Sequence, residues 1–189
     1  MRKIVAALFM SLDGVVEGPG PTDAFEKAGW TMPYYVPEIG EYIGQSSAES
    51  DGMLLGRITY QGFQQAFEPQ GNSDPFAAMM NGATKYVVSN SLTSADWMNS
   101  RLIGGNVIQE ITSLKQQDGR NLNISGSITL VQSLLPHGLI DQLDLLVHPV
   151  TVGMGQRLFV DGFGAGFRLL ESRSFSSGVV LLSLAPNAT

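Results

Sequence analysis

The apolar positions of this chain fall into short unbroken runs and amphipathic stretches. Residues 4–10 are a continuous apolar run, which is typical of a strand covered on both faces. Residues 38–50 place apolar side chains at helical spacing and predict a short helix. The segment between them, residues 17–37, is rich in Gly and Pro. We interpret it as a long loop, a feature that is often functional in compact domains.

The rest of the chain alternates strand-like and helix-like segments. Strands are predicted at 52–56, 85–89, 102–103, 122–124 and 143–147, and helical segments at 57–63, 76–80, 106–119 and 128–135. Residues 167–174 and 178–184 predict a closing hairpin of alternating character. Strands that alternate with helices favour a parallel sheet. We therefore expect an α/β fold of three layers, with a mixed, mainly parallel central sheet, in one domain over residues 1–189.

Composition narrows the class of protein. Hydrophobic residues make up 43% and charged residues 15%, an ordinary globular balance. The net charge is −6 and Lys and Arg form no cluster, which argues against a nucleic-acid partner. An anionic cofactor can still bind, because backbone N–H groups at a helix N-terminus attract phosphate locally.

The absence of cysteine and the character of the N-terminus bear on location. With no Cys, the chain has no disulfide framework or thiolate metal site, which favours a cytoplasmic protein. The N-terminus superficially resembles a signal peptide, but Asp13 and Glu17 follow its short apolar run without a convincing cleavage site. No other run is long enough to span a bilayer, so we expect no membrane partner.

The strongest local signal for function is the change from strand to helix at residues 125–129. Gly126 at the strand exit allows backbone to approach a ligand, and the first N–H groups of the next helix are unpaired. Ser127 and Thr129 add hydroxyl groups, so the loop suits a pyrophosphate. The other interpretation is a plain helix cap with Ser127 as N-cap, and the motif alone slightly favours it.

Two further strand exits carry suitable residues. Gly56-Arg57-x-Thr59 places Arg57 where it can pair with a phosphate, although a solvated surface Arg is equally expected. Residues 89–91 are Ser-Asn-Ser, which favours an ordinary turn over a phosphate or ribose site. All three exits fall on one predicted sheet edge, where ligands of open α/β sheets bind.

Other chemistries have little support. The chain contains no G-x-G-x-x-G, P-loop or G-x-S-x-G motif. His137 and His148 have no metal-ligand spacing, so no metal is expected, and His148 is interpreted as structural more readily than as catalytic. Carboxylates near the expected cleft are Asp13, Glu38 and Glu41, any of which could bind substrate or supply a proton. Aromatic residues within 30–35 line a substrate pocket or cover the core.

Five motifs occur in order along nearly the whole chain: Met-Ser-Leu-Asp-Gly at 10–14, Leu-Leu-Gly-Arg-x-Thr-Tyr at 54–60, Tyr-Val-Val-Ser at 86–89, Gly-Ser-x-Thr-Leu-Val-Gln-Ser-Leu-Leu at 126–135, and the long segment 141–159. Together they resemble the dihydrofolate-reductase-like superfamily that includes the C-terminal reductase domain of the riboflavin-biosynthesis deaminase/reductase. The resemblance implies a sheet of about eight strands with flanking helices and NADPH as hydride donor.

The resemblance also implies roles for individual positions. Those that match cofactor-binding motifs are Ala7, Gly56, Arg57, Thr59, Ser89, Asn90, Gly126, Ser127, Ile128 and Thr129. Arg57 would lie near the phosphates, and Ser89 and Asn90 near the adenosine 2′-phosphate. The 126–129 segment would wrap the pyrophosphate. Ala6 and Ala7 would lie at the nicotinamide end.

The chain departs from the family in two ways that affect the substrate. Dihydrofolate reductases carry a Gly-Gly pair where this chain has Ser125-Gly126, and their substrate-binding acid would fall near Glu38 or Glu41. In the riboflavin reductases the residue that matches Asp13 faces substrate. No deaminase domain with zinc ligands precedes this segment, so a stand-alone relative with another substrate is expected.

The leading hypothesis is an NADPH-dependent reductase that transfers a hydride to a C=O or C=N group of a small, pterin-like or ribityl-pyrimidine-like substrate. Asp13 and then Glu41 are the candidate catalytic or substrate-contacting residues. The alternatives are a non-catalytic nucleotide-binding or regulatory protein on the same fold, and a purely structural or interaction domain. A homodimer is expected, and the apolar segment 179–184 is a candidate for its surface.

Overall fold

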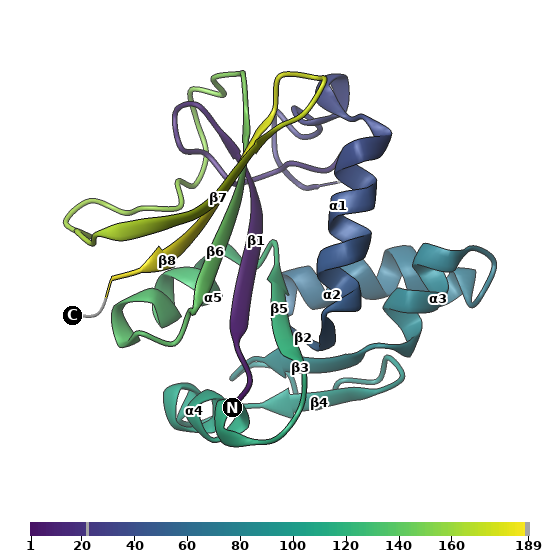
Figure 1. Ribbon diagram of the computed structural model, residues 1–189. Helices are drawn as coiled ribbons and strands as arrows, with labels where there is room; N and C mark the ends of the chain where they lie inside the picture. Colours follow the sequence, from purple (N-terminus) through teal and green to yellow (C-terminus); the bar gives the residue numbers. More distant parts are fainter. Residues whose placement is uncertain (22, 188–189) are drawn as a thin grey trace.

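A central sheet organises the molecule. The structure is a computed structural model that describes residues 1–21 and 23–187. Within these residues eight strands form one sheet in the order β4-β3-β2-β5-β1-β6-β8-β7 (Figure 1). The strands are β1 (Ile4–Ser11), β2 (Ser50–Gly56), β3 (Thr84–Val88), β4 (Ser100–Ile103), β5 (Asn121–Ser125), β6 (Gln142–His148), β7 (Phe167–Ser174) and β8 (Val180–Pro186). Strands β1 to β6 pair in parallel and β7 and β8 add an antiparallel edge, which confirms the expected mixed sheet.

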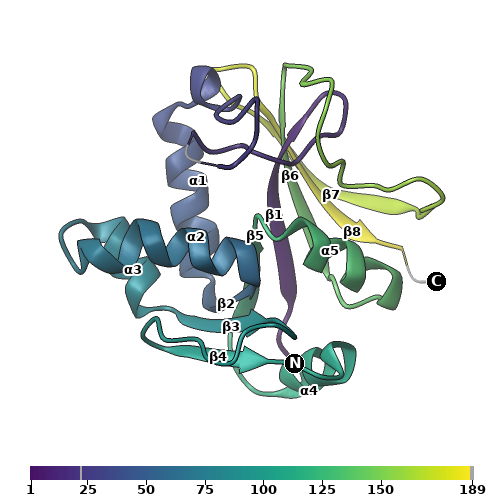
Figure 2. The same ribbon diagram turned by 180° about the vertical axis from the view of Figure 1, so that it is seen from behind.

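Helices cover both faces of this sheet. They are α1 (Pro37–Ala48), α2 (Arg57–Phe67), α3 (Pro75–Gly82), α4 (Val107–Gln116) and α5 (Ile128–Leu134). Helices α1, α2 and α3 lie on one side, and α4 and α5 on the other (Figures 1 and 2). The expected three-layer architecture is therefore confirmed.

The central position of β1 explains its unbroken apolar sequence. The strand lies between β5 and β6, and successive side chains of a strand point to opposite faces. Ile4, Ala6 and Leu8 enter the main core with the apolar faces of α4 and α5. Phe9 packs on the other face, in a cluster with Ile39 of α1. A polar residue at any of these positions would be buried without a partner.

Some element boundaries differ from the sequence predictions. Helix α1 ends at Ala48, and Ser50 already begins β2. Helix α4 ends at Gln116, before the predicted stop at Gly119. The predicted alternation of the first hairpin strand is wrong, because seven of the eight residues of β7 are exposed. This strand is the edge of the sheet, and an edge strand lacks one neighbour that would cover it.

The segment 179–184, which the sequence suggested as a dimer surface, is covered by other strands of the same chain. Strand β8 is paired on both sides, and Val179 and Leu181 are fully buried. Exposed apolar side chains lie instead on β7, at Leu169 and Leu170. A homodimer stays a prediction, and 179–184 contributes little free surface to it. Separately, none of the helices in the described residues is both long and apolar enough to cross a membrane.

Candidate functional site

The three predicted strand exits lie along one edge of the sheet. Strands β3, β2 and β5 are parallel neighbours, so their carboxyl ends meet at the same side. Ser89 and Gly126 directly follow β3 and β5, and Gly56 is the last residue of β2. Neighbouring strands are about 4.8 Å apart, so the three exits fall within reach of one extended ligand. The turn after β5 lies beside the start of α2 (Figure 2).

One hydrogen bond joins two of these exits. The backbone N–H of Gly56 donates to the Ser127 hydroxyl oxygen at 2.8 Å, and Ser127 is buried. Gly56 precedes the first residue of α2, and Ser127 precedes the first residue of α5. The bond therefore holds two helix N-termini together. We call this region the α2–α5 cradle and define it by Gly56, Arg57, Thr59, Gly126 and Ser127.

Gly126 has a backbone conformation that other residues rarely adopt. Its φ is +78°, in the left-handed region, where a Cβ clashes with the backbone. A Cβ built there would lie 3.5 Å from Thr59 Cγ2. Gly126 is itself exposed. The glycine keeps the turn open beside Thr59 and leaves its backbone accessible to a ligand.

The helices of the cradle have no side-chain cap. Neither α2 nor α5 has a side-chain hydrogen bond to its first turn, although Ser127 occupies the N-cap position of α5. By contrast, Asp74 caps α3 and Asn106 caps α4 through their side chains. The Ser127 hydroxyl therefore does not cap α5, and the plain-cap interpretation of this residue is wrong. The first-turn N–H groups of both cradle helices remain available to an anion.

The side chains in and beside the cradle differ in how exposed they are and in what they contact. Arg57 is exposed, and its Nη1 donates to Gln61 Oε1 at 3.3 Å in the same helix. Thr129 is exposed beside the turn. Ile128 packs instead against the main core, so only its backbone can face a ligand. Arg57 therefore has the freedom to meet a phosphate that binds at the helix ends.

The third exit forms the ordinary turn that the sequence favoured. The Ser89 hydroxyl accepts hydrogen bonds from the N–H groups of Ser91 and Leu92 at 3.1 and 3.0 Å. Asn90 Oδ1 accepts from the Gly105 N–H at 3.0 Å. Both side chains thus stabilise the loops after β3 and β4. Their role at a 2′-phosphate stays a prediction.

Ala7 lies in β1 between the cradle and a pocket on the side of the sheet that α1 covers. It lies in β1 opposite Ser125 of β5 and Asp144 of β6, and it is half-buried. Phe9, two residues further, points to the same face and lines a pocket of about 210 Å³. The pocket is lined by Phe9, Pro19, Gly20, Thr31, Met32, Tyr35, Ile39 and His148, and we call it the aromatic pocket.

His148 forms a buried wall of this pocket. Its Nδ1 donates to the Leu146 carbonyl at 2.8 Å, which supports the structural interpretation. The rings of Phe9, Trp30 and Tyr34 surround it edge to face, with centroids 5.4, 5.3 and 5.9 Å away. Burial lowers the pKa of His148, so the ring is neutral at neutral pH. Sequence reasoning missed its place in the pocket.

Asp13 stabilises a loop through its carboxylate. Its Oδ1 accepts from the Ser11 hydroxyl at 2.6 Å and from the Val152 N–H at 3.0 Å, and Oδ2 accepts from the Gly153 N–H at 2.7 Å. The hydrogen bond from Ser11, followed by the one from Val152, lowers the pKa of Asp13 to about 2. An acid of this strength is ionised near neutral pH and is a poor proton donor. Its predicted contact with substrate stays a prediction.

The two candidate carboxylates of α1 lie outside the aromatic pocket. Glu38 Oε2 accepts from the N–H and the hydroxyl of Ser176 at 3.1 and 3.0 Å, which lowers the pKa of Glu38. Glu41 is exposed. It follows Ile39 by two residues, or about 200° around the helix, and Ile39 is the residue of α1 that lines the pocket. The predicted role of Glu41 also stays a prediction.

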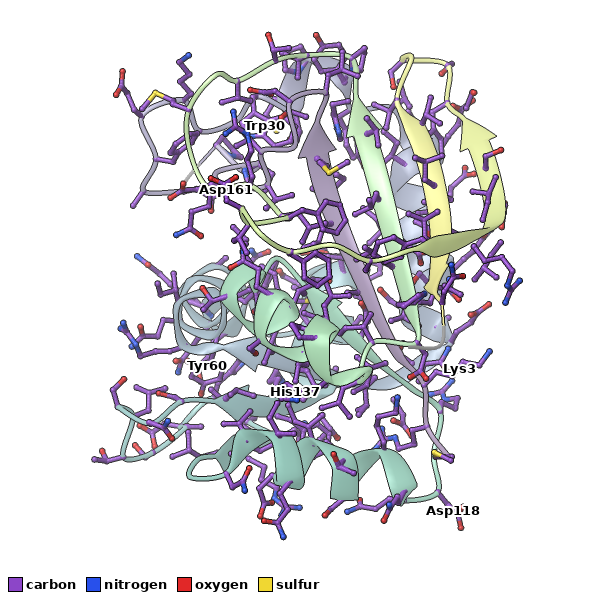
Figure 3. All side chains as sticks on the ribbon, turned by 90° about the vertical axis from the view of Figure 1, so that its left-hand side faces the viewer. Lys3, Trp30, Tyr60, Asp118, His137 and Asp161 are labelled. Carbon is purple, nitrogen blue, oxygen red and sulfur yellow. The ribbon has the colours of Figure 1, made fainter. Side chains whose placement is uncertain are left out.

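The side chains give no sign of a metal centre. Among the described residues no group of three or more His, Asp or Glu is placed to hold a metal ion. Figure 3 shows His137 in the lower half of the view, away from Trp30 in the upper half, and the Trp30 ring packs on His148 at the aromatic pocket. The two histidines therefore do not act together.

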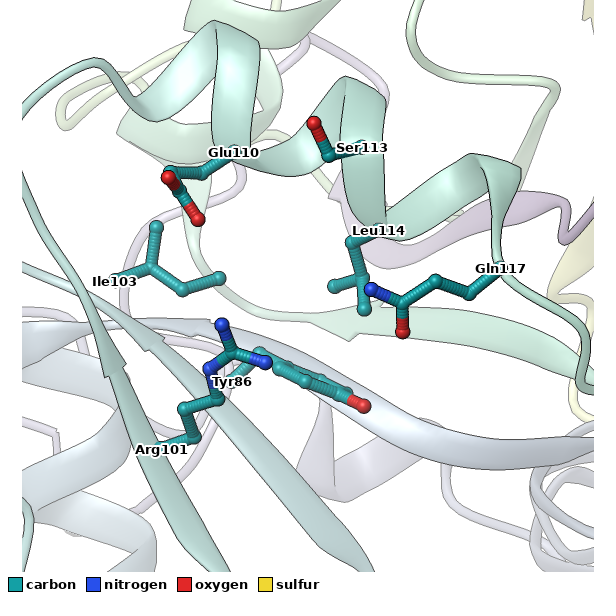
Figure 4. A pocket seen from close by; sticks show the side chains of 7 residues that line it. All are labelled: Tyr86, Arg101, Ile103, Glu110, Ser113, Leu114 and Gln117. Atoms are coloured by element: carbon teal, nitrogen blue, oxygen red, sulfur yellow. The ribbon is translucent and has the colours of Figure 1, made fainter.

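A second hollow lies elsewhere, between α4 and the strands β3 and β4. Its volume is about 120 Å³. Figure 4 shows Glu110 of α4 on one side, and Arg101 beside the ring of Tyr86 on the other. None of the predicted cofactor-binding residues lines it. This hollow is separate from the cradle and from the aromatic pocket.

The strand order of the sheet, together with the α2–α5 cradle and the aromatic pocket, is that of a protein with a dihydrofolate-reductase-like fold, a fold of reductases. A model of the RibD C-terminal domain matches residues 2–181. The chain belongs to the RibD C-terminal domain family.

One sequence relative and two solved structures are similar to this chain. The chain is 29% identical to the uncharacterized protein YyaP of Bacillus subtilis over 188 residues, covering 95% of this chain and 92% of YyaP. It superposes on a putative riboflavin biosynthesis protein from Shewanella with a TM-score of 0.66, 19% identity and full coverage of both chains. It also superposes on dihydrofolate reductase from Enterococcus faecalis, complexed with NADP(H), with a TM-score of 0.65, 14% identity, and coverage of 98% of this chain and 97% of that one. These two structures show the shared fold.

Proposed function

We propose that this protein is an NADPH-dependent reductase that reduces a C=O or C=N group of a small substrate. The observation that carries the proposal is the α2–α5 cradle, where the Gly56–Ser127 hydrogen bond joins two helix N-termini without side-chain caps. Two sets of free N–H groups beside an exposed glycine fit a pyrophosphate. The complex of the Enterococcus faecalis reductase with NADP(H) supports the choice of cofactor.

Each part of the edge has a role in this proposal. The cradle backbone binds the pyrophosphate, and the Arg57 guanidinium meets a phosphate oxygen. Ser89 and Asn90 lie toward the adenosine end, and Ala7 toward the nicotinamide end. When bound there, NADPH supplies the hydride. The chain supplies orientation and electrostatics.

The aromatic pocket is the proposed substrate site. Phe9 follows Ala7 by two residues, so the pocket begins about 7 Å from Ala7 along β1. Asp13 holds the 152–153 segment, which follows the pocket residue His148 in the chain, through its hydrogen bonds. Glu41 contacts a substrate only where that substrate extends beyond the pocket along α1. Substitution of Glu41 by Gln tests that contact through KM.

Titration with NADPH, followed by nicotinamide fluorescence, tests the function. We expect saturable binding, and no binding at high micromolar NADPH would contradict the proposal. NADPH oxidation is then measured with a panel of carbonyl, imine and pterin compounds. Tight binding without oxidation across the panel would favour the alternative, a non-catalytic nucleotide-binding or regulatory protein.

A further inference from the structure

The aromatic pocket offers a ligand almost no charge. Among the described residues that line it, none is Asp, Glu, Lys or Arg, and the imidazole of His148 is buried among aromatic neighbours. The Thr31 hydroxyl already donates to the Pro19 carbonyl at 2.7 Å. The lining is therefore mostly hydrocarbon and aromatic surface.

Several charged groups of the surrounding loops are engaged with backbone, among them Asp23, whose Oδ2 accepts from the N–H of the lining residue Gly20 at 2.7 Å. Lys27 Nζ donates to the Val152 carbonyl at 2.6 Å, and Arg157 Nε donates to the Asp13 carbonyl at 2.9 Å. The Asp13 carboxylate accepts from two N–H groups of the 152–153 segment. A phosphate or carboxylate on a ligand would enter the pocket without a counter-charge, and burying an unpaired charge is costly.

The buried acid nearest to Ala7 is also engaged. Asp144 pairs with Ala7 across β1 and β6, but it does not line the pocket. Its carboxylate accepts from the Ser183 hydroxyl at 2.5 Å and from Gln142 Nε2 at 3.0 Å. Asp144 therefore stabilises the β6–β8 pair. The residues that line the pocket provide no carboxylic acid to bind or protonate a substrate.

Size and shape restrict the ligand further. The volume of about 210 Å³ lies below the about 300 to 1,000 Å³ usual for drug-sized ligands. The half-buried ring of Phe9 and the exposed ring of Tyr35 line the pocket, and such ring surfaces favour a flat aromatic partner. The rim is open to solvent, since Met32 is 52% and Tyr35 59% exposed. Water can therefore reach a bound ligand.

We propose that the substrate of the aromatic pocket is a small, flat, uncharged aromatic carbonyl compound. The proposal rests on the proposed reductase function. In the reaction, hydride from NADPH forms a C–H bond at the carbonyl carbon, and the C=O π electrons move to oxygen. The oxygen takes one proton from a water molecule at the open rim, which leaves as hydroxide into solvent. The products are the alcohol, NADP⁺ and hydroxide. This substrate class excludes ligands that carry a phosphate or a carboxylate into the pocket.

Three benzaldehydes that differ in charge test this inference. They are methyl 4-formylbenzoate, which is neutral, 4-formylbenzoate, an anion, and 4-formyl-N,N,N-trimethylanilinium, a cation. Binding to the protein without NADPH is measured by calorimetry. We expect the neutral compound to bind at least about tenfold more tightly than either ion. Equal or tighter binding of an ion, or binding of none of the three, would overturn the inference.

A matched pair of variants locates the effect. Met32→Lys adds a cation at the pocket rim, and we expect it to reduce the preference for the neutral compound over the anion at least about threefold. Met98→Lys is the control, because Met98 is similarly exposed at 57% and does not line the pocket. It should leave the preference unchanged. Equal effects of both variants would place the binding elsewhere and contradict the inference.

Reduction is scored separately, so that the two proposals can fail independently. If the neutral compound binds with the expected preference but NADPH neither binds nor is consumed, the reductase function fails and the ligand class stands. If NADPH is consumed faster with the anion at equal concentrations, the reductase function stands and the ligand class is wrong.

Discussion

The two ends of the proposed site recognise their ligands by different means. The α2–α5 cradle presents backbone N–H groups at two helix starts, and its side chains are small apart from Arg57. The aromatic pocket presents side chains from distant segments, including Phe9 of β1, Ile39 of α1 and His148 of β6. A pyrophosphate needs donors, which every backbone has. The identity of a substrate depends on the particular side chains that surround it.

This difference predicts how each end responds to substitution. A change in the cradle should alter cofactor affinity and leave the preference among substrates unchanged. A change in the pocket should do the reverse. The experiments below test this separation, beginning with the largest expected effect.

Gly126→Val should have the largest effect. The left-handed φ of +78° costs an L-residue about 1 to 2 kcal/mol, and the side chain would cover the exposed turn. We expect NADPH affinity to fall by more than about 30-fold, or about 2 kcal/mol. Titration of nicotinamide fluorescence measures the affinity, and chemical denaturation measures the stability.

Gly138→Val provides the matched control. Gly138 has a φ of +63° and has no atom near a built Cβ. It follows the 3₁₀ turn Leu135–His137, outside the cradle. The control should lose a similar amount of stability and keep its NADPH affinity. Equal loss of affinity in both variants would mean that strain, and not a blocked phosphate site, explains the effect.

Ser127→Ala comes next, because it leaves the Gly56 N–H without its partner. Ser127 is buried, and loss of a hydrogen-bond partner at a buried site costs about 1 to 3 kcal/mol. We expect this loss in the free energy of unfolding, together with weaker NADPH binding. Ser133→Ala is the control, since the exposed Ser133 hydroxyl only donates to the Leu130 carbonyl within α5. If both variants lose the same free energy of unfolding, the Gly56–Ser127 hydrogen bond does not hold the two helices together.

Arg57→Ala should reduce affinity without reducing stability. The guanidinium is exposed and bonds only weakly to Gln61, so its loss should change the free energy of unfolding by less than about 0.5 kcal/mol. NADPH affinity should fall about tenfold, or about 1.4 kcal/mol. Added salt should narrow the gap between the two proteins, because it screens exposed charges. An unchanged NADPH affinity at low salt would contradict the proposed contact between Arg57 and a phosphate of the cofactor.

The fold class and the turn at Gly126 could be predicted because both depend on local sequence, whereas the Gly56–Ser127 hydrogen bond joins residues far apart in the chain and has no local signal. An unbroken apolar run specifies a central strand, and a glycine between a strand and a helix specifies the turn at 126. The exposure of β7 could not be predicted in this way. It depends on which strand ends the sheet, and the sequence of one strand does not encode its neighbours.

The residues that line the aromatic pocket also could not be predicted from local sequence. Ile39 and Glu41 lie two residues apart in one helix, and only packing decides that Ile39 faces the pocket. His148 gave a signal as a strand-end residue before a proline, but nothing local placed it among Phe9, Trp30 and Tyr34. The sequence ranked Asp13 ahead of Glu41 as a substrate contact, but nothing local indicated that the Asp13 carboxylate bonds to the distant 152–153 segment.

Asp13→Asn has the smallest expected effect and tests how the loop beside the pocket is held. The folded protein lowers the pKa of Asp13 from 3.8 to about 2. The ionised carboxylate therefore stabilises the folded state above about pH 4, and this contribution is lost as the pH falls toward 2. Because the group is partly exposed, we expect Asn to cost only about 1 kcal/mol at neutral pH.

The pH dependence separates this role from a substrate contact. Denaturation at several pH values should show the wild type and Asp13→Asn converging between pH 4 and 2, because protonated Asp13 also lacks its charge. The control Asp161→Asn, at an exposed loop position, should follow the wild type throughout. A constant gap at every pH would contradict the charge-dependent role. If stability is unchanged but KM rises at neutral pH, Asp13 meets the substrate directly, and the pocket carries a charge that its lining does not reveal.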